Sequence, residues 1–598
     1  MPDFDKVRLN TAIDKRSRLS LDYHHVTTND FMFMRPVFYR HVLPSEHGKI
    51  RQMAQFRLAP VAVPTYGRAK ANVRTFFVPY RTIMPNWTEF ITDTVAFSDV
   101  GSTTVGLIEG VPHFSSSAML TLFGIGFINI GDVSIPLSEI APNSSVCDFV
   151  YDGTARKLTP LGKACYAIFV GLGYQFVLGK EPGIVYNALN LLAFAKIWLD
   201  WYSQSAYMDT VLAKSLEILF SHSSLFGYEL TYDDLVAILT ASWSVNYDGD
   251  YFTAAWDEPV SPTQGNFSDF VIKDITNSSS NAVQNRGVVP GTGNATTPVI
   301  MNATVNGTLG SVSQYQLDAL KSLNDYLRRN AISGSRAVDR YLARFGIQLS
   351  SEKLKRSIYY GNMMADITFG DVMSHADTSS SGELSNLGDY SGRGDGVCNK
   401  EFEYDAGGEY GVLMSVCSIL PNAGIVQGYD RHNVHFAKTD FWTPEFDSLS
   451  VQAVQKGEVF LDRFNPGFVA GATDYQKTFG FVPTYAEYKV GRSFVSGDYA
   501  CPASNIGGNS WHLNRMFDST SFGNSVDNLV HSVAFGRGDD RQQYDRIFTN
   551  TTDANEHFNC VFHTNVDAVA SCRSLFDTYD FKDEGKSIDM QTNGVKLN

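Results

Sequence analysis

The chain has 598 residues, enough for several ordinary domains or for one large β-rich domain with long insertions. Aromatic residues make up 13%, which favours strands, whereas charged residues make up only 19%, below the usual quarter. The seven cysteines are widely spaced and form no CxxC motif, which argues against a disulfide scaffold and predicts free thiols in a reducing compartment. The longest apolar, uncharged run lies between Lys163 and Lys180. It is shorter than the roughly 20 residues of a membrane helix, so we expect a buried helix and no membrane insertion.

Charge is unevenly distributed along the chain. The net charge is −15, yet residues 1–82 hold fourteen Lys and Arg against six Asp and Glu, and residues 318–356 hold nine against four. An acidic exterior with basic inner segments would fit a protein that encloses nucleic acid and binds its phosphates in a salt-dependent way. Ordinary charge fluctuation in a long sequence is the alternative. A long chain with few charges is also typical of a subunit that covers much of its surface with neighbours.

Residues 1–30 predict a basic N-terminal arm. The segment has little apolar periodicity and carries five cations: Lys6, Arg8, Lys15, Arg16 and Arg18. Such arms often bind nucleic acid or cross subunit boundaries, and a frayed, solvated terminus is the alternative. The first twenty residues are charged rather than apolar, so we expect no signal peptide.

A block crowded with arginine follows at residues 31–81. Its three β-rich runs are separated by Leu43-Pro44, by Pro64 with Gly67, and by Pro79. The cations predict a β-framework with one face or edge for an anionic partner. Salt bridges between subunits are the alternative use of the same arginines.

Helices and long loops are expected in the middle of the chain. A short helix is predicted at 86–93, and a clearer one at 187–202, where apolar residues recur at three- and four-residue steps: Leu191, Phe194, Trp198 and Trp201. Stretches rich in Gly, Ser and other small polar residues predict three insertions, at about 99–185, 257–312 and 374–398.

Two more helices are predicted at 314–330 and 335–345. On the second, Arg336, Arg340 and Arg344 share one face at four-residue spacing. A phosphate-facing stripe is the functional interpretation, and an ordinary solvated face is the alternative.

Further strands are predicted late in the chain, at 410–420 and 558–566, and a turn with a strand is predicted at 479–490. Strands thus occur toward both ends of the sequence, with helices and loops inserted between them. This order predicts a mainly β fold, an antiparallel jelly-roll sandwich with long helical and loop insertions, in a single domain over residues 31–598.

Catalytic motifs are not evident in the sequence. It contains no GxSxG elbow, HExxH helix or phosphate-binding loop, so we expect neither an enzyme nor a cofactor. His432 and His435 with Asp440 could ligate a metal, but their spacing is unspecific and favours a structural pair. Asp248 and Asp250 lack the ligand ladder of a calcium loop. Two Arg-Gly-Asp triplets, at 393–395 and 537–539, are expected by chance in a long Gly-rich chain.

Five segments, taken in order, resemble the major capsid protein of the Microviridae, the small icosahedral single-stranded DNA phages, and especially the gokushovirus-like branch. They are HVLPSEHGKI with FRLAPVAVP and RTFFVPYRTI, NALNLLAFAKIWLDWY, NYDGDYFTAAW, the 314–346 helix pair, and FGFVPTYAEYKV followed by WHL. Asn190 and Leu192 stand where that family has Pro and Arg, which indicates a divergent lineage.

The resemblance implies an eight-stranded jelly roll whose copies build a T=1 shell around circular single-stranded DNA. It implies further partners, namely a pilot or scaffold protein and a host surface receptor. Localisation would be the virion, assembled in the host bacterial cytoplasm. The DNA contacts we expect are Lys6, Arg8, Lys15, Arg16 and Arg18, then Arg336, Arg340 and Arg344. The alternative function is a secreted β-rich adhesin or carbohydrate-binding protein, suggested by the sequons and the Arg-Gly-Asp triplets.

Overall fold

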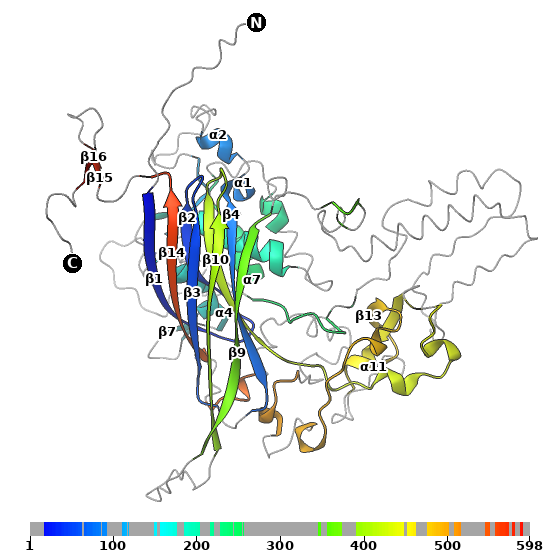
Figure 1. Cartoon of the computed structure of the whole chain (residues 1–598). Coiled ribbons are helices and arrows are strands. Elements are labelled where there is room, and N and C mark those ends of the chain that lie inside the picture. Colours follow the sequence, from blue (N-terminus) through cyan, green and yellow to red (C-terminus); the bar gives the residue numbers. More distant parts are fainter. Residues whose placement is uncertain are drawn as a thin grey trace, which may run out of the picture.

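An eight-stranded antiparallel sheet forms the centre of the molecule (Figure 1). The structure is a computed structural model, and it describes the following residues, with short gaps inside several ranges: 17–91, 110–118, 149–175, 184–203, 216–220, 228–255, 342–347, 356–373, 390–461, 475–500, 508–515, 544–549, 556–572, 577–579 and 587–589. The eight strands are β1 (Ser17–Asn29), β2 (Met34–Val42), β3 (His47–Leu58), β4 (Arg68–Pro79), β9 (Ile358–Met373), β10 (Tyr390–Asp405), β11 (Gly411–Pro421) and β14 (Phe558–Ala570).

The strand order is that of a jelly roll. It runs β1-β14-β3-β10-β9-β4-β11-β2, so β1 pairs with β14, β2 with β11, β3 with β10 and β4 with β9. Among the core strands, therefore, the first pairs with the last, the second with the next to last, and so on inward. Such a wound antiparallel ribbon is the jelly-roll topology, and the predicted fold class is confirmed.

The sheet folds over into two facing layers between β10 and β9. These two strands pair only from Tyr390↔Met373 to Asp395↔Thr368, at one end of each. Polar side chains then link the layers across the interior: the Gln52 amide of β3 donates to Ser415 Oγ of β11 at 2.8 Å. Thr75 of β4 donates to the Gln52 carbonyl oxygen at 3.1 Å, so this buried network is satisfied from both layers.

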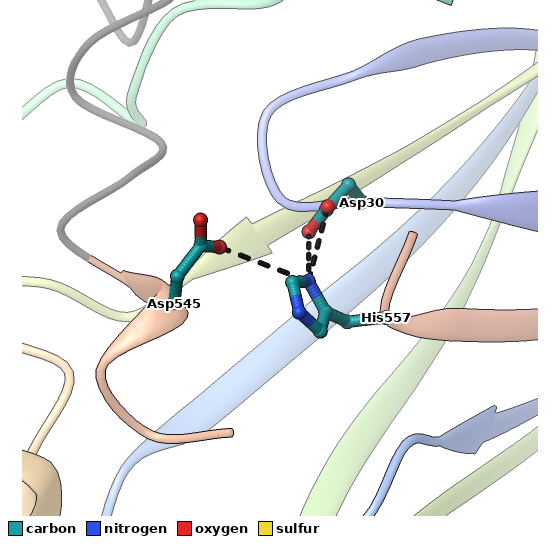
Figure 2. Close-up of side chains that lie close together, drawn as sticks. All are labelled: Asp30, Asp545 and His557. Carbon is teal, nitrogen blue, oxygen red and sulfur yellow. Dashed lines mark hydrogen bonds and ion pairs between the residues drawn. The ribbon is translucent and has the colours of Figure 1, made fainter. Parts of the chain in front are cut away.

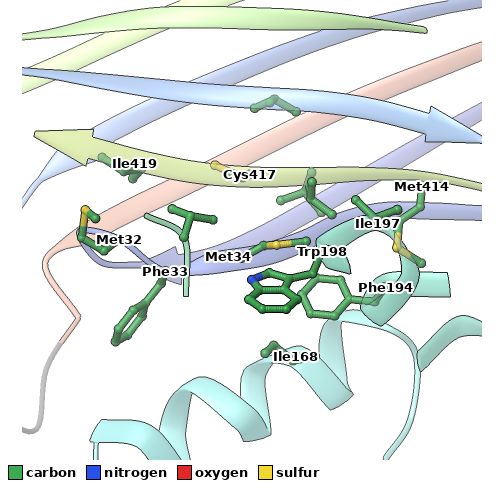
Figure 3. Packing of buried hydrophobic residues seen from close by; sticks show 14 of the residues in the cluster. Met32, Phe33, Met34, Ile168, Phe194, Ile197, Trp198, Met414, Cys417 and Ile419 are labelled. Atoms are coloured by element: carbon green, nitrogen blue, oxygen red, sulfur yellow. The ribbon is translucent and has the colours of Figure 1, made fainter. Parts of the chain in front are cut away.

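The two layers differ in what covers them. Strands β3 and β14 alternate between buried and more exposed residues, as expected for a layer with one face in solvent. By contrast, β11 is buried along its whole length, because helices cover its outer side. Figure 3 shows Trp198, Phe194 and Ile168 of this helical layer packed beneath Met34 and Met414.

The helical layer consists of α4 (Pro160–Gly171), α5 (Leu189–Ile197), the π-helical turn η3 (Trp198–Tyr202) and α7 (Tyr232–Ser242). Short helices α1 (Tyr80–Ile83), α2 (Trp87–Ile91) and α11 (Lys456–Val459) lie elsewhere, with 3-10 turns η5 (Arg431–Val434), η6 (Lys438–Asp440), η7 (Ala486–Tyr488), η8 (Gly497–Ala500) and η9 (Gly508–Trp511). Four two-stranded sheets complete the described elements: β5 (His113–Ser115) with β8 (Val185–Asn187), β6 (Phe149–Tyr151) with β7 (Arg156–Leu158), β12 (Val451–Gln455) with β13 (Thr478–Pro483), and β15 (Asp577–Tyr579) with β16 (Ser587–Asp589).

Several predicted elements are confirmed by the structure. The three β-rich runs become β2, β3 and β4, the strand at 410–420 becomes β11, and the closing strand becomes β14. The helix at 187–202 is found as α5 continued by η3, and the first half of the apolar run after Lys163 lies in α4. Within the described residues, no helix is long and apolar enough to cross a membrane. The five cysteines in that part of the chain, namely Cys165, Cys398, Cys417, Cys560 and Cys572, are free thiols.

Two predictions are wrong in part. The arm expected at 1–30 is a strand from residue 17 onward, since β1 pairs with β14 over its whole length. The loop expected at 374–398 ends earlier, because Tyr390 begins β10. The predicted insertion at 257–312 lies outside the described residues, as do the helix at 314–330 and nearly all of the helix at 335–345.

Candidate assembly surface

Exposed apolar side chains gather in one part of the molecule, the described residues between 425 and 500, which we call the aromatic lobe. In Figure 1 it lies beside the jelly roll, around β13 and α11. Eight large apolar side chains of this lobe have exposed fractions between 36% and 88%: Val434, Phe436, Phe441, Trp442, Tyr488, Val490, Phe494 and Tyr499. Exposed apolar surface marks protein interaction sites where it is contiguous, so the lobe is the candidate assembly surface.

The interior of the lobe, in contrast, contains charged groups. Arg431 donates to Glu458 at 3.0 Å and lies 3.7 Å from Glu487, and both carboxylates are nearly fully buried. Arg492 donates to the backbone carbonyls of Gly428 and Glu458, at 2.8 and 3.1 Å. Burial raises the pKa of Glu458, and the neighbouring Arg431 opposes that shift. Ion pairs and hydrogen bonds therefore hold the lobe together, while many of its aromatic rings face outward.

Phe436 is the most exposed ring in the lobe, at 88%, and its backbone is held in place. The Asp440 carboxylate accepts hydrogen bonds from the backbone N–H groups of Phe436 and Ala437, at 3.0 and 2.8 Å. The Tyr485 hydroxyl donates to the Thr439 carbonyl at 2.9 Å and ties the same turn to the lobe. A fixed backbone lowers the entropy lost when an exposed ring is covered by a partner.

The histidines and the aspartate that could have ligated a metal in this region have separate structural roles. His432 pairs with Asp430 at 3.0 Å, and His435 lies 3.5 Å from Glu487. The two imidazole rings lie 5.3 Å apart, while Asp440 binds the backbone, as described above. This arrangement fits the structural interpretation of the His432–His435 pair.

Asp250 also has a structural role. Its Oδ2 accepts a hydrogen bond from the buried Arg515 at 2.6 Å, and its Oδ1 accepts the backbone N–H of Thr253 at 2.7 Å. The Arg515 guanidinium lies 3.9 Å from the centroid of the Tyr247 ring. Asp250 therefore joins two distant segments of the chain. The Arg393–Asp395 triplet lies within β10, where it pairs with β3 or β9, and the triplet at 537–539 lies outside the described residues.

The arginines of the 31–81 block are mostly engaged within the chain. Arg35 pairs with Glu556 and Arg40 with Glu46, and all four side chains are largely buried. On the solvent face of β3, Arg51 donates to Glu401 at 2.7 Å. Lys49, on the same face, lies 3.2 Å from Glu401 and 3.3 Å from Glu403. The prediction of a basic face for an anionic partner is therefore wrong for this face, where cations and carboxylates alternate.

Of the predicted DNA contacts, Arg18 is the one that the structure describes. Its side chain is 75% exposed, near the start of β1, with the guanidinium 3.6 Å from Asp567 of β14. The remaining predicted contacts lie outside the described residues: Lys6, Arg8, Lys15, Arg16, Arg336, Arg340 and Arg344.

Comparison with known families decides the identity of the fold. The model of the phage capsid protein family, described as "Capsid protein (F protein)", matches residues 7–118 and 163–572, well over half of the chain. The chain belongs to this capsid protein family. The match begins before β1 and ends after β14, so it includes every strand of the jelly roll.

Two relatives place this capsid protein among the Microviridae. It is 23% identical over 536 residues to capsid protein VP1 of Chlamydia phage 1, covering 85% of this chain and 88% of the relative. It is 20% identical over 522 residues to capsid protein VP1 of Bdellovibrio phage phiMH2K, covering 84% and 85%. These values confirm a divergent, gokushovirus-like major capsid protein and do not favour the adhesin alternative.

The sequence patterns do not single out the aromatic lobe as a candidate surface. They predict a turn and a strand at 479–490 and a structural histidine pair, whereas the structure has β13 ending at Pro483 and the turn η7 after it. The available signal was the close spacing of Phe436, Phe441 and Trp442 in an otherwise polar stretch. Whether such rings face the core or solvent depends on tertiary packing, which the spacing alone does not give.

Proposed function

We propose that copies of this major capsid protein assemble into a closed T=1 shell that encloses a circular single-stranded DNA genome and presents a surface for host attachment. The observation that carries the proposal is the aromatic lobe, which exposes rings that a neighbouring subunit would cover. The family assignment supports self-assembly, so the partner we propose for the lobe is a second copy of this chain. The role is structural and needs neither catalysis nor a cofactor.

Burial of the lobe would supply much of the driving force for assembly. Apolar surface removed from water contributes about 25 cal/mol per Å². Loss of rigid-body freedom and the ordering of side chains offset most of that gain. Each contact is then weak, while many symmetric copies of the same contact give a stable closed particle.

The genome would be held by phosphate contacts without sequence readout. We assign these contacts first to the cations of the N-terminal segment, namely Lys6, Arg8, Lys15, Arg16 and Arg18. The arginine stripe comes second: Arg336, Arg340 and Arg344. Aromatic stacking on unpaired bases would add to them. The insertions would shape the outer surface for a host receptor, a pilot or scaffold protein would assist, and assembly would take place in the host bacterial cytoplasm.

The lobe can be tested with paired substitutions. Phe436→Ser and Phe494→Ser remove the two most exposed rings of the lobe, at 88% and 72%, without touching the buried ion pairs. We expect each variant to reduce the yield of closed particles, and the double variant to leave mainly free subunits in sedimentation velocity. Lys438→Ser, two residues from Phe436 and also exposed, is the matched control and should assemble like the parent protein.

The same experiment can contradict the proposal. Circular dichroism and thermal melting must show that the variant subunits keep their fold. Folded double variants that form particles with the parent yield would show that the lobe is not the assembly surface.

A further inference from the structure

Three metal-ligating side chains meet inside the protein, at one end of the β1–β14 pair (Figure 2). Asp30 directly follows β1, His557 directly precedes β14, and Asp545 belongs to the segment 544–549. Their ligand atoms all lie within 4.8 Å of one another. The exposed fractions are 0% for Asp30, 2% for His557 and 7% for Asp545. Segments far apart in the sequence therefore converge on one buried point.

Both carboxylates approach the same imidazole atom. Nδ1 of His557 lies 3.1 Å from Oδ2 of Asp30 and 3.7 Å from Oδ1 of Asp545. A single Nδ1 proton points in one direction, so it can bind one of these oxygens well but not both. Two buried carboxylates repel each other, and a positive charge between them relieves the repulsion. An imidazolium or a metal ion could supply that charge.

Two of the three ligand separations are close to those of a tetrahedral metal site. With metal–nitrogen and metal–oxygen distances of about 2.0–2.2 Å, neighbouring ligand atoms of such a site lie roughly 3.4 Å apart. The observed 3.1 and 3.7 Å, both measured from Nδ1 of His557, lie just below and just above that value, and the two carboxylates offer oxygens within 4.8 Å of each other. Imidazole nitrogen together with carboxylate oxygen suits zinc and similar ions, whereas magnesium and calcium prefer oxygen alone.

Neighbouring groups hold the Asp30 and His557 side chains in their orientations. Oδ1 of Asp30 accepts the backbone N–H of Phe31 at 2.8 Å. The His557 ring stacks on Phe548, with centroids 3.8 Å apart and an interplanar angle of 9°. The Phe548 backbone N–H in turn donates to the backbone carbonyl of Asp545 at 3.0 Å, which links the main chain of the third ligand to the same ring. Fixed outer contacts of this kind are typical of metal sites.

We propose that Asp30, Asp545 and His557 bind a divalent transition-metal ion of the zinc type as a structural site. The ion would join the end of β1 and the start of β14 to the 544–549 segment, and so secure the edge of the sheet where the first and last core strands pair. Three protein ligands leave one tetrahedral position for a water molecule or another oxygen.

Metal content and melting of the unaltered protein give the first test. Protein purified without chelators should contain one zinc ion per chain, as measured by elemental mass spectrometry. Treatment with EDTA should lower the melting temperature, and added Zn²⁺ should restore it in a concentration-dependent way, whereas Mg²⁺ should not. Co²⁺ added after EDTA should give the visible absorption of a tetrahedral site.

Variants give the second test. His557→Gln and Asp545→Asn should lose the zinc and the sensitivity of melting to EDTA. His563→Gln is the matched control, because His563 lies exposed on β14, six residues after His557, and the variant should keep both properties. If the site variants do not fold, the metal content and EDTA response of the unaltered protein still decide. Absence of zinc with melting indifferent to EDTA and to Zn²⁺ would overturn the proposal in favour of an imidazolium held between two carboxylates.

Discussion

Arg35 of β2 forms an ion pair with Glu556, which lies two residues before β14, and the two side chains are only 2% and 9% exposed. The same guanidinium donates to the Ala164 carbonyl of α4 at 2.7 Å. A single arginine thus joins a strand from the start of the chain to a helix of the covering layer and to the approach of the last core strand. In this protein an arginine of the 31–81 block stabilises the fold rather than offering charge to a partner.

Removal of the Arg35 side chain should lower the free energy of unfolding. Arg35→Leu leaves Glu556 buried without its cation, and we expect a loss of about 3–5 kcal/mol in the free energy of unfolding. Arg57→Leu, at an exposed position of β3, is the control and should change it by about 0.5 kcal/mol or less. Denaturant titration of the purified protein measures both. The double variant Arg35→Met with Glu556→Leu removes both charges. If it is no more stable than Arg35→Leu, the loss of stability does not arise from an unpaired, buried Glu556 carboxylate.

The close approach of β3 and β14 predicts that a larger residue at Gly48 lowers stability. A Cβ atom at Gly48 would lie 2.1 Å from the carbonyl oxygen of Asp567, and the opposing backbone cannot move without breaking the strand pairing. Gly48→Ala should therefore lower the free energy of unfolding by roughly 1–3 kcal/mol. At Gly408 an added Cβ would meet nothing within 4 Å, so Gly408→Ala should be nearly neutral. Equal melting temperatures for the two variants would contradict the close approach of β3 and β14.

Thiol chemistry gives a third prediction. Burial raises the pKa of Cys398 to about 11 and that of Cys417 well above its usual value. At pH 8 little of the reactive thiolate is then present, and we expect alkylation of Cys398 at least roughly 100-fold slower than in the unfolded chain. The rate should rise as the pH approaches the raised pKa. Mass spectrometry of peptides after iodoacetamide treatment, with and without urea, measures the ratio, and similar rates in both conditions would contradict it.

The basic N-terminal residues give a prediction for the assembled particle. Arg18 is 75% exposed, and Arg16, outside the described residues, precedes the same strand. Replacement of both by Ala should lower the packaged DNA, or the melting temperature of particles in low salt, because phosphate contacts are lost. Ser20→Ala, at an exposed position of β1, is the control. If genome content and the melting temperature of the particles are both unchanged, Arg16 and Arg18 do not contact the DNA.

The sequence predicted those strands whose signals are local. β2, β3 and β4 have alternating or apolar patterns bounded by proline, so their limits could be placed within a few residues. The sequence of β1 predicts an arm because it is polar and charged, with Arg18 and Asp22 at outward positions. Only Leu19 and Leu21 supply large apolar side chains on its inward face near the start, which is too weak a pattern to predict a strand. Its partner β14 lies more than 500 residues later, as in the pair Ser17↔Ala570, so nothing nearby indicated a sheet.

The first part of β10, up to Cys398, has the composition of a loop because glycine recurs at its inward positions. An added Cβ at Gly394 would lie 3.1 Å from Leu58, and one at Gly396 would lie 3.1 Å from Ile367. Large side chains on neighbouring strands therefore occupy the space that most strand residues would fill. The outward rings of the aromatic lobe and the meeting of Asp30 with His557 depend likewise on packing between distant segments, which local patterns do not encode.

The central claim is that identical copies of this chain close into a shell. Electron microscopy of the purified, unaltered protein under assembly conditions tests it most directly, and a map of the particle would place the aromatic lobe. The account predicts closed particles of one diameter, with Phe436 and Phe494 covered by a neighbouring copy. Dispersed single molecules, or closed particles whose lobes face solvent, would contradict it.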